Sequence, residues 1–598
     1  MMWRAVAALL CASIVYGLIQ VRRKRAELAG CPQPPVMHWL LGSIPIVAKA
    51  MPLFPEDTHF HVIVNYIQQK YNMPSVWYLD LWPVGDRFVL TNDPVIASQY
   101  ATTGQSLPKA SAATNYLNVF LGKDSLLTSE GQHWKSLRAM YNPGFSATHL
   151  MTLVPYMVDS TLIYVDILRA KARANELFQL EEISTRLTID IIGKVVLDTD
   201  LNSQQQDHPL VTAFRERASF MHNSARTFSI LNNLEFRRLW RLHQNTKTLD
   251  HLVGVEVDRA LAKRKQSNQT ASQKSFKDRR RSAVDLALDG YAQEKLTNRA
   301  SGTSIKPSAG EADATFRTEA ITAVKTFLFA GHDTTSSTIA YGLYLLHHHP
   351  TVRSKLITEL HAVYGADLSP ATLAPLIKSD PYTINSLPYL TAILKETLRL
   401  FPPASTLRQT SNPEHTIPNP SPKGSPWQQR AQLPLANTAF WPIALLIHRN
   451  EEYFPRPTSF IPERFLPEQS PFPFPQSKLF TPEGKDAFRA FEKGPRTCIG
   501  EQLALIETKV ILAIVVGAEL GFRAEVWGRE ARGTGGESTL VGAEEMEGRL
   551  RRKEVGAREG RGRVVEGFEI YQILRGAGKP AYGMPGRMYF MEEVENRG

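Results

Sequence analysis

A ten-residue stretch near the C-terminus, residues 491–500, constrains this chain more than any other. It reads Phe-Glu-Lys-Gly-Pro-Arg-Thr-Cys-Ile-Gly and holds Cys498, the only cysteine beyond position 31. The other two, Cys11 and Cys31, lie in or beside an N-terminal apolar run, so Cys498 has no partner within the soluble part for a disulfide or a tetrahedral zinc site. Its thiol is then either buried and inert, or it is the thiolate ligand of a haem iron. The second role also requires close backbone approach and a nearby cation, which Gly494, Gly500 and Arg496 supply.

Length and charge set broad limits. With 598 residues, 43% of them hydrophobic, the chain can build a large core, either as several domains or as one domain with added segments. Part of the formal net charge of +11 comes from basic clusters at residues 277–281 and 549–553. Such runs are typical of solvated loops, so we expect no nucleic-acid partner.

The N-terminal segment is apolar and then strongly basic. Residues 6–21 form a nearly uncharged run, and Arg-Arg-Lys-Arg follows at 22–25. By the positive-inside rule, residues 1–25 are expected to be a membrane anchor with a lumenal N-terminus and a cytosolic remainder. A cleaved signal peptide is the alternative, but its charges would precede the apolar run. Residues 26–45 are rich in proline and are expected to form a stiff hinge.

Residues 46–598 are expected to form one mainly helical domain. Short extended pieces are predicted near residues 77–90 and 433–441. Residues 264–311 are polar except around 284–291, which predicts a surface loop with one short helix inside it. A second polar stretch, residues 528–562, is rich in Gly, Arg and Glu and is typical of an inserted loop.

A long helix is predicted over residues 317–348, and its middle reads Ala-Gly-His-Asp-Thr-Thr from Ala330 onward. Gly costs about 1 kcal/mol in a helix relative to Ala, and Asp and Thr compete for backbone hydrogen bonds. Such residues inside an otherwise strong helix indicate function. Ala330 and Gly331 would leave room for a small ligand beside a widened turn, while Asp333 and Thr334 would relay protons. The alternative is a helix kink whose polar side chains face solvent.

Two further residue pairs share a helix face. Glu396 and Arg399 are spaced i, i+3 on a helix predicted over residues 388–400, so they can form an ion pair, although such pairs are also common on surfaces. Trp134 and Arg138 are spaced i, i+4, and their donors suit one carboxylate. An amphipathic helix with a boundary tryptophan is the alternative for this second pair.

In chain order, these motifs resemble those of the cytochrome P450 superfamily. The resemblance covers about residues 35–525 and includes Pro-Glu-Arg-Phe at 462–465, which would add an arginine to the Glu396–Arg399 pair. It implies the P450 fold, mainly α with a small β-rich lobe, preceded here by a single N-terminal transmembrane helix. It also implies haem b with the Cys498 thiolate as axial ligand.

The resemblance assigns roles to individual residues. Those implied to bind the cofactor are Trp134, Arg138, Ala330, Gly331, Arg408, Phe491, Gly494, Arg496, Cys498 and Gly500. Those implied to be catalytic are Asp333 and Thr334. Glu396, Arg399 and Arg464 are implied to be a structural triad behind the haem loop.

The resemblance also implies an activity. The expected reaction is a monooxygenation that inserts one oxygen atom from O2 into a lipophilic substrate, by hydroxylation, epoxidation or a related oxidation. Electrons would come from a separate NADPH–cytochrome P450 reductase, with cytochrome b5 as a second candidate donor. The protein would lie in the endoplasmic reticulum membrane with a cytosolic catalytic domain. Two alternatives stay open: a haem-thiolate isomerase or dehydratase, which would be expected to lack the Asp-Thr pair, and a non-catalytic haem sensor.

Short sequence similarities within the superfamily bear on the class of substrate. Three pieces, residues 142–146, 448–450 with 453–457, and 579–585, resemble filamentous-fungal members of the superfamily that tailor secondary metabolites such as polyketides and terpenoids. By family analogy, the substrate pocket is formed by mostly apolar segments. These segments are residues 106–126, 220–234, 324–329, 404–407 and 584–588.

Residues 576–581 imitate half of a dinucleotide-binding fingerprint. They read Gly-Ala-Gly-Lys-Pro-Ala, but Pro580 and Pro585 prevent the helix that the fingerprint needs. We therefore expect no nicotinamide site in this chain.

Overall fold

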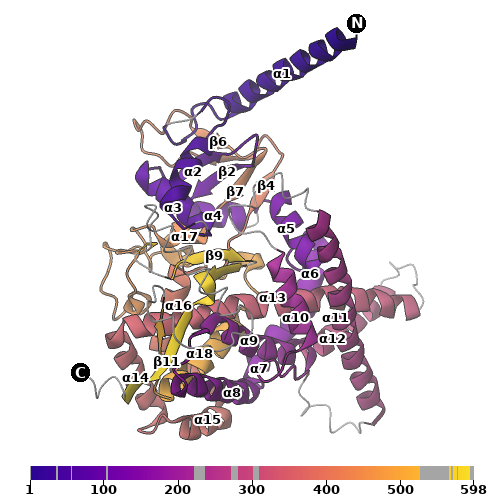
Figure 1. Ribbon diagram of the computed structural model, residues 1–598, viewed down its shortest axis with the longest axis vertical. Coiled ribbons are helices and arrows are strands. Elements are labelled where there is room, and N and C mark those ends of the chain that lie inside the picture. Colours follow the sequence, from indigo (N-terminus) through magenta and orange to yellow (C-terminus); the bar gives the residue numbers. More distant parts are fainter. Residues whose placement is uncertain are drawn as a thin grey trace.

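The computed structural model describes residues 2–35, 38–55, 57–102, 106–220, 236–270, 281–300, 309–525, 565–566, 570–575 and 577–592. Helices dominate the described chain and surround a long central helix (Figure 1). The α-helices are α1 (Met2–Glu27), α2 (Ile44–Ala50), α3 (Phe60–Lys70), α4 (Pro94–Ala101), α5 (Ser111–Leu121), α6 (Gly131–Tyr141), α7 (Ala147–Met151), α8 (Val154–Arg173), α9 (Leu180–Leu197), α10 (Pro209–Ser219), α11 (Phe236–Thr270), α12 (Ala283–Ala300), α13 (Ala309–His348), α14 (Pro350–Tyr364), α15 (Pro370–Ser379), α16 (Pro388–Leu400), α17 (Ala444–His448) and α18 (Glu501–Gly517).

The strands form small sheets. They are β1 (Val76–Asp80), β2 (Arg87–Thr91), β3 (Phe178–Gln179), β4 (Arg408–Thr410), β5 (Thr416–Pro418), β6 (Gln432–Pro434), β7 (Thr438–Trp441), β8 (Leu520–Ala524), β9 (Gln572–Arg575), β10 (Ala577–Pro580) and β11 (Pro585–Phe590). One sheet has the order β1-β2-β7-β4, with β2 and β7 parallel. The extended pieces predicted near residues 77–90 and 433–441 are therefore confirmed, and both contribute to this sheet.

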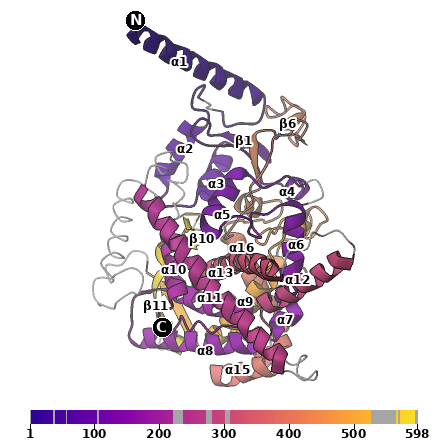
Figure 2. The ribbon, with the colours of Figure 1, turned by 90° about the vertical axis from the view of Figure 1, so that its right-hand side faces the viewer.

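α13 is the centre of the main hydrophobic core. It packs against α9 on one side and against α16 and α18 on others, and β10 also lies along it (Figure 2). The predicted helix over residues 317–348 is confirmed and begins earlier, at Ala309. α16 has the predicted bounds of residues 388–400.

α1 leads away from the rest of the molecule in both views (Figures 1 and 2). Among the residues whose side chains the structure describes, no single helix is long and apolar enough to cross a membrane. By length and composition alone, the bent pair Gly131–Met151 and Val154–Arg173 passes the same criteria together.

The segment after α1 is packed rather than a free hinge. Arg25 forms an ion pair with Asp80 at the end of β1. Leu28 and Cys31 are buried in an apolar cluster with residues of the first sheet. The prolines of residues 26–45 suggested a stiff hinge, but apolar side chains just before them pack with residues of the sheet and so join the segment to the domain.

The polar loop expected at residues 264–311 is mostly helical where it is described. Its first residues complete α11, α12 is longer than the short helix predicted at 284–291, and its last residues begin α13. Few apolar side chains are enough for α12, because Ala283, Val284 and Ala287 share one buried face. The insert expected at residues 528–562 lies outside the described residues.

Candidate functional site

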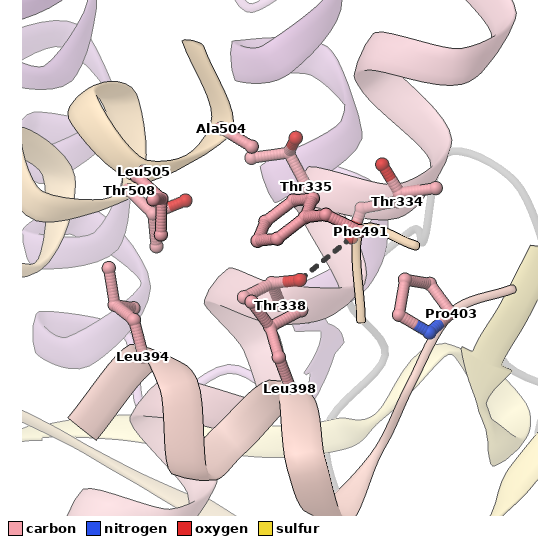
Figure 3. Close-up of a pocket in the computed structure, with 10 residues that line it drawn as sticks. All are labelled: Thr334, Thr335, Thr338, Leu394, Leu398, Pro403, Phe491, Ala504, Leu505 and Thr508. Atoms are coloured by element: carbon pink, nitrogen blue, oxygen red, sulfur yellow. Dashed lines mark hydrogen bonds between the residues drawn. The ribbon is translucent and has the colours of Figure 1, made fainter. Parts of the chain in front are cut away.

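A pocket lies between α13, α16 and α18 (Figure 3). Its lining residues are Thr334, Thr335, Thr338, Leu394, Leu398, Pro403, Phe491, Ala504, Leu505 and Thr508. The walls therefore come from the predicted central helix, the Glu-x-x-Arg helix, and the Cys498 loop with the helix that follows it. The Thr338 hydroxyl donates a hydrogen bond to the Thr334 carbonyl (3.0 Å), so it is held along α13.

The Cys498 loop is held by its own backbone. The Cys498 N–H donates to the Phe491 carbonyl at 2.8 Å. Gly494 has a φ of +71°, and a Cβ at this position would lie 2.5 Å from the Thr102 carbonyl oxygen, so only glycine fits here. A Cβ on Gly500 would have the Cys498 Sγ as its nearest atom, at 3.8 Å, so glycine leaves that side of the sulfur open.

The Cys498 side chain itself is accessible within the described chain. Desolvation by the surrounding protein nevertheless raises the pKa of its thiol, and the charge of Arg138 acts in the opposite direction. A sulfur that is both accessible and close to a guanidinium suits a thiolate that binds a metal.

Four cations gather at this loop. The Arg138 guanidinium donates to the Thr497 carbonyl at 2.8 Å, and the Arg496 guanidinium stacks 3.9 Å from the centre of the Trp134 ring. Arg408 is buried at the start of β4, and its Nε has no hydrogen-bond partner within the described chain. The fourth cation is Lys109, for which burial, followed by the charges of Arg496 and Arg408, lowers the pKa to about 7.

This cluster holds more positive than negative charge. Arg496 forms an ion pair with Glu130. In the part of the chain that the structure describes, no ion-pair partner is found for Lys109, Arg138 or Arg408. Glu130 and Glu492 balance this charge only in part, and desolvated positive charge is costly, so the cluster suits a ligand that brings anionic groups.

Lys109 offers a test of this cluster. Lys109→Met is expected to release bound haem about tenfold faster than the unmodified protein, because one charge-assisted contact to the ligand is lost. The rate can be measured by transfer of haem to an excess of apomyoglobin. Lys135→Met, which removes an exposed cation from α6, is the matched control and should not change the rate. Equal rates for the two variants would contradict the role of Lys109.

The residues at the middle of α13 face different sides. Thr334 lines the pocket, and its hydroxyl donates to the Ala330 carbonyl one turn earlier at 2.9 Å. Asp333 is buried and contacts the C-terminal strand β10 instead. Because successive helical positions are about 100° apart, the acid and the alcohol do not share a face.

Two expectations about α13 need correction. The helix is regular throughout Ala309–His348, so the widened turn is not found. Gly331 was expected to leave room for a ligand, but a Cβ at this position would lie 2.8 Å from Cγ1 of Ile192 on α9. Its missing side chain allows the two helices to approach, and it is not among the pocket residues.

The structure brings Glu396, Arg399 and Arg464 together in a fully buried triad. Arg399 donates two hydrogen bonds to the Glu396 carboxylate, at 2.7 and 2.8 Å, and Arg464 donates one at 3.0 Å. The remaining guanidinium protons go to backbone carbonyls, including those of His448 and Pro455. Burial tends to raise the pKa of Glu396, but the two arginines outweigh it and lower the pKa.

Glu507 is a buried carboxyl group of α18 that the sequence did not reveal. One of its oxygens, Oε2, has no hydrogen-bond partner among the described residues, and its other contact is with Thr335. Burial raises the pKa of Glu507 to about 8. The side chain therefore keeps its proton at neutral pH.

The raised pKa of Glu507 makes stability depend on pH. The unfolded chain loses this proton near its ordinary pKa of 4.5 while the native protein keeps it to about 8, so stability falls as pH rises between these values. Glu507→Gln removes the effect, and its unfolding temperature relative to the unmodified protein should rise by a few degrees between about pH 5 and pH 8. The exposed Glu468→Gln serves as the control in differential scanning calorimetry. A difference that does not depend on pH would contradict the prediction.

Comparison with known proteins decides the family. The sequence model described as Cytochrome P450 matches residues 32–518. The chain belongs to the cytochrome P450 family. It is 33% identical to the cytochrome P450 monooxygenase acrF of Aspergillus aculeatus, over 90% of this chain and 99% of that protein. It is 32% identical to the cytochrome P450 monooxygenase polC of Polytolypa hystricis, over 99% of this chain and 95% of that protein.

A more distant relative is the human cytochrome P450 4V2, with 28% identity over 86% of this chain and 90% of that protein. This P450 is thus a haem-thiolate monooxygenase of a family that uses redox partners and lipophilic substrates. Members of the family bind haem through a cysteine thiolate. Residues 32–518 contain one cysteine, Cys498, so this side chain is the ligand.

The residues present fit haem. The fit rests on the excess of positive charge beside the Cys498 loop, the open side of the sulfur at Gly500, and the pocket bounded by α13 and α18. Lys109 and Glu507 were missed in the sequence because a single Lys or Glu carries no pattern. Residues 106–126 were named as a pocket segment, and a lysine within such an apolar segment was the available signal for Lys109.

Proposed function

We propose that this P450 oxygenates a lipophilic secondary metabolite at a haem held beside the pocket between α13 and α18, as a membrane-anchored enzyme of the endoplasmic reticulum. One observation carries the proposal of the site: apart from Pro403, the pocket is lined by the central helix α13, the Glu-x-x-Arg helix α16, and the Cys498 loop with the helix α18 that follows it. The similarity to two fungal monooxygenases over nearly the whole chain supports a fungal metabolic role.

The site residues have distinct proposed tasks. The Cys498 sulfur would ligate the iron, and Trp134, Arg138, Arg408 and Arg496, together with Lys109, would hold the haem propionates. Phe491, Ala330 and the glycines at 494 and 500 shape the space for the macrocycle; Gly331, in contrast, serves the packing of α13 on α9. When bound, haem supplies binding and activation of O2.

Proton delivery is the task of α13. The Thr334 hydroxyl already holds a hydrogen bond to the Ala330 carbonyl and can turn its proton toward the pocket that it lines. Asp333 is the carboxyl group that replaces this proton. Leu394, Leu398 and Leu505 exclude water from the pocket around the threonine.

Electron supply and location complete the proposal. Electrons come from a separate NADPH–cytochrome P450 reductase, with cytochrome b5 as a further donor, docking on the cationic surface that includes the exposed Lys135 of α6. Residues 1–25 are proposed as the anchor because the apolar run at 6–21 is followed by four cations. The domain then comprises residues 46–598, with the packed segment 26–45 joining it to the anchor.

The test is a reconstituted reaction. Purified protein is mixed with reductase, NADPH and a panel of polyketides and terpenoids under ¹⁸O2, and the products are analysed by mass spectrometry. We expect product that carries one ¹⁸O atom and forms only when reductase is present. Unlabelled product formed without reductase would support an isomerase or dehydratase instead. Haem binding without turnover of any substrate in the panel would favour a sensor.

A further inference from the structure

Three charged side chains from distant parts of the chain meet beside α13. The Lys579 ammonium group of β10 lies 2.7 Å from Oδ1 of Asp333 and also forms an ion pair with Glu181, in the first turn of α9. The second oxygen of Asp333, Oδ2, accepts a hydrogen bond from the Ala577 N–H at 3.1 Å. Both oxygens of the acid are therefore occupied by the C-terminal hairpin.

One cation serves two carboxylates in this cluster. Burial tends to lower the pKa of Lys579, but Asp333 and Glu181 outweigh it and raise the pKa. Burial tends to raise the pKa of Glu181, but Lys579 outweighs it and lowers the pKa. Lys579 is therefore firmly protonated.

Other titratable groups lie near the cluster of Lys579, Asp333 and Glu181. His332 of α13 is buried, which lowers its pKa and keeps the imidazole neutral. Arg215 of α10 acts on Glu181 at longer range, and the Tyr341 hydroxyl lies near the same carboxylate. The Glu181 oxygen that meets Lys579 also accepts hydrogen bonds from Thr185 (3.0 Å) and Ser336 (3.3 Å). These contacts therefore stabilise the ionised form of Glu181.

The hairpin that carries Lys579 is tied to the pocket. The Gly578 N–H donates to the carbonyl of Pro403, which lines the pocket, at 2.7 Å. The Gln572 amide on the paired strand β9 donates to the Pro402 carbonyl at 3.1 Å. The position of Lys579 relative to Thr334 is therefore set by backbone contacts rather than by a free chain end.

We propose that Lys579 is a positioning residue that controls when Asp333 can serve Thr334: it holds the acid at β10, and Glu181 takes over the ammonium group when the acid turns toward the pocket. The proposal rests on the proposed function of Asp333 as a proton donor. The exchange keeps Lys579 paired throughout, so the acid is released without leaving a buried cation alone.

The first test follows product formed per NADPH oxidised, from about pH 6 to about pH 9, in the reconstituted holoenzyme. In Lys579→Met, two carboxylates share a buried site without their cation, so one of them binds a proton near neutral pH. The acid limb of the pH profile should therefore shift to higher pH by about one unit or more. In Glu181→Gln the acid limb should shift to lower pH, and product formation should slow severalfold, because Asp333 no longer competes with a second carboxylate for Lys579. Lys579→Arg keeps the positive charge and should restore the acid limb to the pH found for the unmodified enzyme.

The second test does not depend on turnover. Thermal unfolding of the holoenzyme variants is compared at about pH 5.5 and about pH 8. Lys579→Met should lose more stability at the higher pH, where unpaired carboxylates are costly, and the double variant Lys579→Met/Glu181→Gln should recover part of the loss. If Lys579→Met does not fold, the Glu181→Gln and Lys579→Arg profiles still decide the question.

The outcomes separate this proposal from the proposed function. Unchanged profiles for Lys579→Met and Glu181→Gln, or shifts in the same direction, overturn the role of Lys579. Asp333→Asn is expected to lower coupled product formation on the order of 10²-fold. If it does so while the Lys579 and Glu181 variants match the unmodified enzyme, only the role of Lys579 fails. If Asp333→Asn is as well coupled as the unmodified enzyme, the proton-delivery role of Asp333 fails, and with it the basis of the proposal.

Discussion

Replacing Cys498 with alanine is expected to abolish the red-shifted band in the carbon monoxide difference spectrum of the reduced protein. That band depends on a thiolate bound to the iron, and residues 32–518 hold no other cysteine that could replace it. The surrounding cations and the pocket remain, so residual haem binding without the band is compatible with this expectation. Monooxygenase activity should fall below detection.

Cys31→Ala is the matched control for this experiment. Cys31 is also a thiol close to an arginine, Arg430, but it is buried beneath the first sheet, where burial raises its pKa. Its replacement should leave the spectrum unchanged and cost little stability. Survival of the band in Cys498→Ala, or its loss in Cys31→Ala, would overturn the ligand assignment.

Breaking the buried triad should have the second largest effect. Arg399→Met leaves the Glu396 carboxylate with Arg464 as its remaining guanidinium partner, and it removes the hydrogen bonds to the His448 and Pro457 carbonyls. Removing one partner of a buried ion pair costs about 3–5 kcal/mol. We therefore expect a strong decrease in the unfolding temperature, and loss of haem as the loop behind the triad loosens.

A control variant and the dependence on pH test the structural role of the triad. Lys478→Met breaks an exposed ion pair with Glu452 and should change stability by less than about 1 kcal/mol. Because the pKa of Glu396 is lowered, the contribution of the triad is present at neutral pH and is lost as pH falls below about 4.5, the ordinary pKa of this group. The difference between Arg399→Met and the unmodified protein should therefore shrink in acid. An Arg399→Met protein that retains haem and its full unfolding temperature would contradict the structural role.

Local patterns were sufficient to place the long helices and several site residues. The bounds of α16 and most of α13 follow from periodicity and from the prolines that flank them, which act within a few residues. The motif helices and the Cys498 loop supply most of the pocket lining, whereas none of the five segments named by family analogy contributes a lining residue, and of these most of residues 220–234 lies outside the described residues. Polar composition was a weaker guide: residues 264–311 read as a loop, yet three apolar residues on one face are enough to dock α12 against the core.

What the sequence by itself determined was the chemistry of the centre: one cysteine with glycines and an arginine around it, and a helix whose Asp-Thr pair is poor helix chemistry. What only the tertiary structure decided was the partner of each group. Lys579, distant in the sequence, takes Asp333 away from Thr334; Gly331 serves the packing of α13 on α9; and Lys109 joins the arginines at the Cys498 loop. The physical reason is that residue type sets which interactions a group can make, whereas burial and long-range packing select the interaction that forms.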